Sequence, residues 1–387
     1  MTEIYRRTAL ANQMTQRLLH PGVLDEGLRS GLFISGLRRT GKTTFLNADL
    51  IPALEAEGAI VIYVDLWSDT LASPALLVRD AIARKLAELQ NPASAALARL
   101  KRVSSAEVQA LGLKFGFKLD GLGAAGAATL AQALAEVVDK ARTDVVLIVD
   151  EVQQAMSSDD GQRMLLALKA ARDAINPRPG TPGYLLFIGT GSHQALIGEL
   201  GARRNQAFAG AVQLDFPVLD TDYVAHLLER LAREPDGPLP STDATTDAFR
   251  TLGHRPEELR KALRLTRSQV AAGGDADAVL PVVARTLRSA AADVELAKVD
   301  ALGALAVAVF DRIAAAPGAA RRLYSTDAAA AYTRALGRDV RVEEVQKVVN
   351  ALVDANLVLR RGHGQYEVAD PFVLAIANEK KALAAGA

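Results

Sequence analysis

The chain has 387 residues, half of them hydrophobic, and its 45 basic residues balance its 45 acidic residues, so the formal net charge is zero. This length allows two or three domains, and the neutral charge argues against a protein that coats nucleic acid without sequence preference. The absence of cysteine excludes disulfides, thiolate catalysis and cysteine-bound zinc, and the five scattered histidines argue against a histidine metal site.

The first twenty residues have no apolar run of the signal-peptide type. No stretch of the chain reaches the ~18 uninterrupted apolar residues that a membrane span needs. The apolar stretch 301–316 is interrupted by Asp311 and Arg312, so we expect a buried helix there. These features predict a soluble, cytoplasmic protein with no membrane partner.

Five short runs in the first 216 residues have the near-continuous apolar character of strands buried on both faces of a parallel sheet. Segments of helical period lie between them, for example 73–90 and 129–142. Alternation of strands and helices predicts an α/β domain. The predicted strands are GLFISG (31–36), AIVIYVDL (59–66), DVVLIVDE (144–151), YLLFIGTG (184–191) and AVQLDF (211–216).

The first predicted strand leads into GLRRTGKT (36–43), which satisfies the pattern G-x-x-x-x-G-K-[ST] before a predicted helix. The glycines let backbone N–H groups turn toward a phosphate, and the helix start adds its positive end. We expect Lys42 to reach the β- and γ-phosphates and the Thr43 hydroxyl to ligate Mg²⁺. The expected nucleotide-binding residues are Gly36, Arg38, Arg39, Thr40, Gly41, Lys42, Thr43 and Thr44.

The stretch GLKFGFKLDGLG (112–123) alternates apolar and polar residues, unlike the other runs. It predicts a half-exposed strand or hairpin inserted before the third helix. Either it covers the core as an edge strand, or it contacts a partner through Lys114 and Lys118.

Asp150 and Glu151 end the third predicted strand. A carboxylate buried there needs a cation or hydrogen bonds, and Asp150 beside a phosphate loop is expected to hold Mg²⁺ directly or through water. Glu151 is expected to orient and polarise an attacking water. After the fourth strand, Thr190 or Ser192 is expected to hydrogen-bond that water or the γ-phosphate.

Two arginine-bearing segments follow. Arg203 and Arg204 lie just before the fifth strand. Either both are solvated loop residues, or one of them is an arginine finger that enters a neighbouring subunit's site. In GHRPEELRKAL (253–263), a proline starts a predicted helix. Arg255 at that helix start is expected to face the nucleotide, with Arg260 as the alternative one turn along.

After residue 217 the predicted strands stop, and four helical patterns indicate a small helical domain. The last ninety residues predict three more helices and then two strands in LVLRRGHGQYEV (357–368), which is the outline of a winged helix. The four helical patterns are 220–233, 242–251, 256–271 and 278–292, and the three later ones are 300–315, 326–336 and 342–355.

Together, GLRRTGKTTF, LIVDE, IGTGS, ARRNQAFAG and GHRPEELRKAL resemble AAA+ ATPases, and more narrowly the STAND-like archaeal/bacterial ATPase clade, which is similar to the Orc1/Cdc6 type. ADPFVLAIA (369–377) after the hairpin is also similar to that clade, where an Asp-Pro-aromatic step follows the wing. The usual family opening of aromatic, proline and glycine residues ahead of the phosphate loop is missing, so we expect adenine contacts from residues 5–12 and from a helical lid at 219–295.

The resemblance implies a P-loop ATPase core (1–218) with a five-stranded parallel sheet in order 5-1-4-3-2, a helical lid (219–295) and a winged-helix domain (296–387). It implies the Walker A motif at 36–43 and the Walker B motif at Asp150 and Glu151. It further implies sensor 1 at Thr190 or Ser192, a finger at Arg203 or Arg204, and a sensor-2-like arginine at Arg255.

Two functions fit these features. The first is an ATP-hydrolysing switch, with Mg²⁺ as cofactor, whose lid and winged helix rearrange with nucleotide state and act on a protein or DNA partner. The second is a nucleotide-gated DNA-binding module with little turnover. The presumed recognition helix (341–356) is a poor phosphate-facing surface, whereas Arg360 and Arg361 in the wing are better. A finger acting in trans would require self-association, and a metabolic kinase is disfavoured because no acceptor site is evident.

Overall fold

The chain folds into two compact units. The structure is a computed structural model that describes residues 4–69, 71–103, 114–115, 129–192, 207–234, 237–270, 274–355, 357–362 and 364–385. The first unit contains Met1–Gly36 and Gly41–Pro217, and the second contains Leu37–Thr40 and Val218–Ala387. Most of the hairpin predicted at 112–123 lies outside the described residues.

A five-stranded parallel sheet forms the centre of the first unit, and its strand order β2-β3-β4-β1-β5 confirms the predicted order. Each strand lies within the run of apolar residues that predicted it. The strands are β1 (Leu32–Ser35), β2 (Ile60–Asp65), β3 (Val145–Asp150), β4 (Leu185–Gly191) and β5 (Val212–Asp215).

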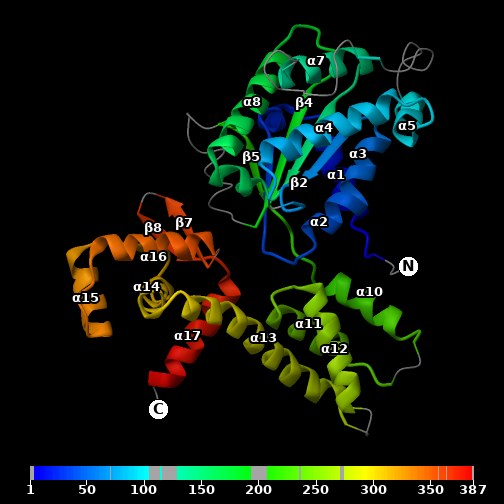
Figure 1. Cartoon of the computed structure of the whole chain (residues 1–387). Coiled ribbons are helices and arrows are strands. Elements are labelled where there is room, and N and C mark those ends of the chain that lie inside the picture. Colours follow the sequence, from blue (N-terminus) through cyan, green and yellow to red (C-terminus); the bar gives the residue numbers. More distant parts are fainter. Residues whose placement is uncertain are drawn as a thin grey trace. The chain divides into compact units, whose positions relative to one another are not determined.

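Successive side chains of these strands alternate between two separate apolar clusters, as the pleat of a strand requires. Ile62 and Val64 belong to one cluster, which includes residues of α4 (Pro74–Gln90), α7 (Leu130–Ala141) and α8 (Asp159–Ile175). Val61 and the ring of Tyr63 belong to the other, with α1 (Thr8–Leu19) and α3 (Ile51–Ala56). The sheet is therefore the middle of three layers, which explains why its strands have almost no polar residues (Figure 1).

The helices of the first unit begin at residues that suit helix starts. Ser73, Thr129 and Ser158 accept backbone N–H groups at the starts of α4, α7 and α8, which stabilises each helix end. The helices are α1 (Thr8–Leu19), α2 (Lys42–Phe45), α3 (Ile51–Ala56), α4 (Pro74–Gln90), α5 (Ala95–Val103), α7 (Leu130–Ala141) and α8 (Asp159–Ile175), with 3-10 turns η1 (Val23–Arg29) and η3 (Val152–Ser157).

The helix that follows the phosphate loop is interrupted by a π turn, η2 (Leu46–Leu50), between α2 and α3. Pro52 lies just beyond it and has no backbone N–H to donate to the preceding turn, which accounts for the changed hydrogen-bond pattern. The π turn carries Asn47 and the buried Asp49, both of which contact neighbouring segments.

The second unit begins with four helices, whose positions agree with the four predicted helical patterns. The last of them, α13, runs to residue 301 rather than 292, because residues 293–301 contain no glycine or proline to end it and Gly303 follows. The boundary predicted at 295 therefore falls inside a helix. The four are α10 (Thr221–Leu231), α11 (Thr242–Thr251), α12 (Pro256–Val270) and α13 (Ala276–Ala301).

The rest of the second unit has its own apolar cluster, built around Phe310, Val345 and Val358. Its described residues form four helices and an antiparallel sheet in the order β6-β8-β7. Among the described residues, no helix is both long and apolar enough to cross a bilayer. The elements are α14 (Ala304–Ala314), β6 (Ala320–Arg321), α15 (Thr326–Leu336), α16 (Val342–Asp354), β7 (Val358–Gly362), β8 (Gln365–Val368) and α17 (Pro371–Ala385).

Candidate active site

The loop at 36–43 connects β1 to α2 and has the backbone of a phosphate-binding loop. Gly41 has φ 93°, and a Cβ atom there would meet no heavy atom within 4 Å, so glycine is needed for its conformation. Gly36 is needed for a close approach, since its Cβ would lie 3.0 Å from the Cβ of Phe216. The Lys42 side chain is 6% exposed, and its Nζ donates to the Gly36 carbonyl oxygen at 2.5 Å.

Asp150 is the most enclosed charged residue of the site, at 1% exposure. Its Oδ2 accepts the hydroxyls of Thr43 at 2.8 Å and Tyr63 at 3.1 Å. Its Oδ1 accepts the Thr190 hydroxyl and the backbone N–H of Glu151, the latter at 3.1 Å. Donors on both oxygens hold the carboxylate in one orientation and offset the cost of its burial.

The Thr43–Asp150 pair provides a direct test of whether these residues suit magnesium. Mg²⁺ prefers hard oxygen ligands and is usually held by one or two protein oxygens together with phosphates and water. A threonine hydroxyl on the phosphate loop, 2.8 Å from a carboxylate at the end of β3, supplies that donor set. The residues therefore fit a magnesium ion that arrives with a nucleotide.

Glu151 lies immediately after β3 and has φ 55°, a left-handed conformation that is uncommon for a residue with a side chain. This turn directs its carboxylate toward the end of β4. There, Oε2 accepts the amide of Gln153, which is 4% exposed, and lies 3.4 Å from the Ser192 hydroxyl. The glutamate is thus oriented by residues from two segments, as a general base requires.

The two candidates for the sensor position have different surroundings. The Thr190 hydroxyl is buried and donates to Asp150, so it orients that carboxylate. Ser192 instead lies beside Glu151. Of these alternatives, Ser192 is therefore the better placed to contact a water or phosphate oxygen next to the glutamate.

Tyr63 was not predicted from the sequence, yet its hydroxyl reaches Asp150 from the adjacent strand. Burial, followed by the charge of Asp150, raises the pKa of Tyr63. Asn47 on the π turn donates to the Thr43 carbonyl oxygen at 3.0 Å, and its amide, near the Tyr63 hydroxyl, partly offsets the rise in the pKa of Tyr63. One signal was visible in the sequence, because tyrosine is the only side chain with a polar tip inside the apolar run AIVIYV.

Asp65, at the end of β2, is the register partner of Asp150. Burial, its largest influence, and the charge of Asp150 raise the pKa of Asp65, while a hydrogen bond from the Trp67 N–H lowers it. Two carboxylates on neighbouring strand ends give this edge of the sheet an acidic character.

The N-terminal segment packs on the helix after the phosphate loop. Arg6 donates to the Asp49 carboxylate at 2.6 Å, and the Arg7 backbone N–H donates to the same group at 3.1 Å. The Arg7 guanidinium lies 4.8 Å from the ring centre of Phe216 and donates to the Pro217 carbonyl oxygen at 2.7 Å. The expectation that residues 5–12 contact adenine remains a prediction.

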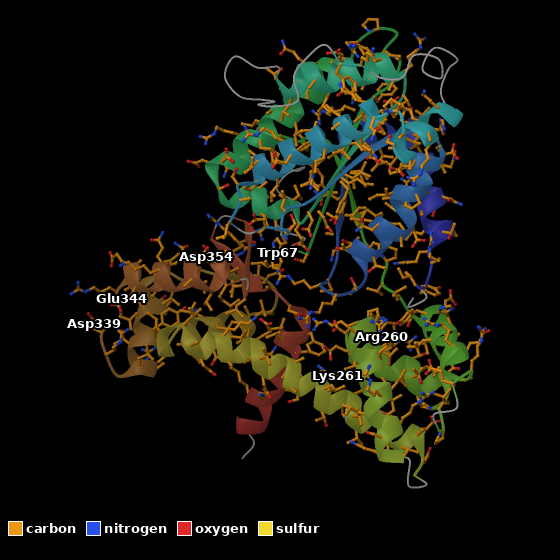
Figure 2. The ribbon with its side chains drawn as sticks, turned by 45° about the vertical axis from the view of Figure 1, so that its right-hand side comes forward. Trp67, Arg260, Lys261, Asp339, Glu344 and Asp354 are labelled. Atoms are coloured by element: carbon orange, nitrogen blue, oxygen red, sulfur yellow. The ribbon has the colours of Figure 1, made fainter. Side chains whose placement is uncertain are left out.

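Arg255 lies in the second unit and is 7% exposed. Its guanidinium pairs with Asp370, and its centre lies 4.6 Å from the ring centre of Phe372. Asp370 and Phe372 belong to the Asp-Pro-aromatic step that follows β8. The alternative, Arg260, is exposed on α12 next to Lys261 (Figure 2).

Several predicted residues cannot be placed or are only partly placed. Arg203 and Arg204 lie outside the described residues, and the side chain of Arg361 is also not described. Arg38 is half-buried, while Arg39 and Thr44 are exposed and Thr40 is buried. Their contributions to nucleotide binding remain predictions.

The helix predicted to recognise a partner, α16, carries both signs of charge. Asp339 just before it, Glu344 in its first turn and Asp354 at its end are acidic (Figure 2). Glu344 forms an ion pair with Arg338 at 2.9 Å, and this pairing lowers the pKa of Glu344. Such a surface is a poor match for the phosphate backbone of a duplex.

The comparisons with known proteins agree with this geometry. Residues 26–197 match the family model described as AAA domain. No curated protein matches the sequence. Among solved structures, the Walker-type ATPase of Pyrococcus abyssi is similar at 18% identity, covering 96% of this chain and 97% of its own, with a TM-score of 0.56. The ORC2 protein of Aeropyrum pernix in its ADP form is similar at 13% identity, covering 98% of this chain and 96% of its own, also with a TM-score of 0.56.

These matches span the phosphate loop, both strand-end carboxylates and nearly the full length of each solved structure. Residues 26–197 thus resemble an AAA domain in sequence, and the chain shares its fold with these two solved structures.

Proposed function

We propose that this protein binds ATP with Mg²⁺ and hydrolyses it, and that it uses nucleotide state to change the arrangement of its helical lid and winged helix. The observation that carries the proposal is the Thr43–Asp150 hydrogen bond at 2.8 Å beside the loop of Lys42, with Glu151 as the next residue. The matching family and the ADP form of the similar ORC2 structure support nucleotide binding.

Each side chain has a task in this proposal. Lys42 and the loop N–H groups bind the phosphates, and Thr43 and Asp150 provide oxygen ligands. A bound magnesium ion would neutralise phosphate charge. Glu151, held by Gln153 and Ser192, is placed to accept a proton from a water molecule.

Glu151→Gln tests this assignment, because it keeps the shape of the side chain and removes its basicity. We expect turnover of ATP to fall at least about 100-fold, while ATP affinity stays within about twofold. Glu57→Gln, at an exposed position after α3, is the matched control and should leave both unchanged. Equal turnover by the Glu151 variant and the wild type would show that the mechanism is wrong.

We further propose that the finger arginine acts in trans. Arg203→Ala/Arg204→Ala would then be inactive alone, as would Glu151→Gln. A mixture of the two should recover activity, since one subunit supplies the glutamate and the other the arginines. No recovery in the mixture, with turnover per subunit independent of protein concentration, would contradict self-association.

For the partner, we propose a protein rather than duplex DNA, because α16 is flanked by acidic residues (Figure 2). Arg360 on β7 is exposed and is the feature that favours DNA. Duplex binding should therefore be weak, and Arg360→Glu should change it less than twofold. Tight, salt-sensitive binding that Arg360→Glu reduces about tenfold would favour the DNA-binding alternative.

A further inference from the structure

We propose that Tyr63 is a positioning residue that orients the Asp150 carboxylate toward Thr43, so that the site takes up the metal-bound form of the nucleotide. The inference rests on the proposed binding of ATP with Mg²⁺. It concerns a residue on β2, a strand at the edge of the sheet that carries neither motif of the phosphate site.

The sheet register brings the tyrosine to this position. Tyr63 lies opposite Ile148, two residues before the Asp65–Asp150 pair, and its long side chain extends toward the strand ends. The ring packs in the apolar cluster on the side of α1 and α3, which limits its movement. Its hydroxyl then lies 3.1 Å from Oδ2 of Asp150.

Tyr63 contacts the same carboxylate oxygen of Asp150 that Thr43 contacts. Oδ2 accepts from both Tyr63 and Thr43, whereas Oδ1 accepts from Thr190 and the Glu151 N–H. Tyrosine is protonated at neutral pH, because its ordinary pKa is about 10, so it donates here. Without the Tyr63 hydroxyl, the Thr43 hydroxyl would be the one remaining side-chain donor to Oδ2. The same Thr43 hydroxyl is also the proposed ligand of the metal ion.

A second side chain lies near the donor. Asn47 donates to the Thr43 carbonyl oxygen at 3.0 Å, and its amide is close enough to the Tyr63 hydroxyl to lower the pKa of that group. Thr43, Tyr63 and Asp150 are joined directly by hydrogen bonds, which connect the phosphate-loop helix to two strands. Residues that orient a metal ligand in this way strongly influence metal affinity.

Tyr63→Phe removes only the hydroxyl, and nucleotide binding is measured by titration of a fluorescent ATP analogue, first in EDTA and then at increasing Mg²⁺. We expect affinity in EDTA to stay within twofold of the wild type. The Mg²⁺ concentration that gives half of the metal-dependent gain in affinity should rise about three- to tenfold. Tyr324→Phe is the matched control, since it removes a tyrosine hydroxyl bonded to Tyr366 at 2.9 Å in the second unit, and should change neither quantity.

The possible results separate the two proposals. If the wild type binds nucleotide more tightly with Mg²⁺ and Tyr63→Phe responds identically, the positioning role is wrong and the proposed function stands. If Tyr63→Phe also loses affinity in EDTA, the tyrosine supports the loop in general and the positioning role is again wrong. If the wild type binds no nucleotide, the proposed function fails and this inference fails with it.

Discussion

The two units of the molecule both bury charged side chains, but they use them differently. At the end of the sheet in the first unit, Lys42 donates to the Gly36 carbonyl oxygen and directly follows Gly41, which has open space around it. In the second unit, Arg255 is engaged by the Asp370 carboxylate and the Phe372 ring. A buried charge costs several kcal/mol unless its environment compensates it.

The difference indicates how to assign a role to a buried charge. Arg255 and Asp370 form an ion pair across a sequence separation of 115 residues, so their pairing joins α12 to the start of α17. Lys42 lies next to backbone that glycine keeps clear, which suits a ligand that carries the opposite charge. The pairing of Arg255 therefore stabilises the fold, whereas the surroundings of Lys42 suit ligand binding. Substitutions can test this distinction.

Lys42→Ala should give the largest effect. Loss of a charge-assisted contact to phosphate is expected to weaken ATP binding about 100-fold, while thermal stability stays the same or rises. Titration with a fluorescent ATP analogue and a thermal melt measure the two quantities. Lys85→Ala is the control, since Lys85 pairs with Glu55 at 3.1 Å and should leave ATP affinity unchanged. A large loss of stability with Lys42→Ala would instead show that this lysine stabilises the fold, as Arg255 is expected to do.

Arg255→Ala should give the opposite profile. It leaves Asp370 without its partner, so we expect the free energy of unfolding of the second unit to fall by about 2 kcal/mol. ATP affinity should stay within twofold. Adding Asp370→Asn should cost little more, because the pair is already broken. Arg250→Ala is the control, as its exposed pairs with Asp220 and Asp247 are worth little. A selective loss of ATP affinity would instead support the prediction from the sequence that Arg255 faces the nucleotide.

Arg260→Ala sharpens the comparison within one helix. Because Arg255 is held by Asp370, we expect the exposed Arg260 to be the arginine of α12 that influences turnover, by about tenfold. ATP hydrolysis under saturating ATP measures the effect. The neighbouring Lys261→Ala removes a similar charge from the same helix and should change turnover less than twofold (Figure 2). Equal effects of both substitutions would indicate a general charge effect.

Asp65→Asn should give the smallest effect. Burial raises the pKa of Asp65, so the folded protein holds this proton more tightly than the unfolded chain does. Stability is therefore lost as pH rises above the ordinary aspartate pKa of about 4 and through the higher folded value. The asparagine side chain does not ionise and so removes this loss, and the free energy of unfolding at pH 7 should rise by about 0.5 kcal/mol or less. Chemical denaturation at pH 4 and pH 7 tests this. A larger gain in stability at pH 4 than at pH 7 would contradict a raised pKa of Asp65.

Much of the first unit could be predicted because β1 to β4 are buried on both faces, whereas the edge strand β5 is partly exposed. Such strands are continuous apolar runs, and the phosphate loop lies in a short motif directly after one of them. Asp150 and Glu151 were visible for the same reason, since acidic residues at the end of an apolar strand need an explanation.

The remaining features depend on long-range pairing that no local pattern reveals. The role of Tyr63 requires the register of β2 on β3, and the pairing of Arg255 requires a carboxylate 115 residues away. The sequence also could not separate Thr190 from Ser192, because only the direction of each side chain relative to Asp150 and Glu151 distinguishes them.

The contacts of Arg6 and Arg7 have a practical consequence for handling this protein. Through Asp49 and the Pro217 carbonyl, Arg6 and Arg7 join the phosphate-loop helix to the last residue of the first unit. A purification tag placed close to these arginines, or a shortened clone that starts after them, would disturb that connection. Expression designs should therefore keep both arginines and place any fusion partner after a spacer, or at the other end of the chain.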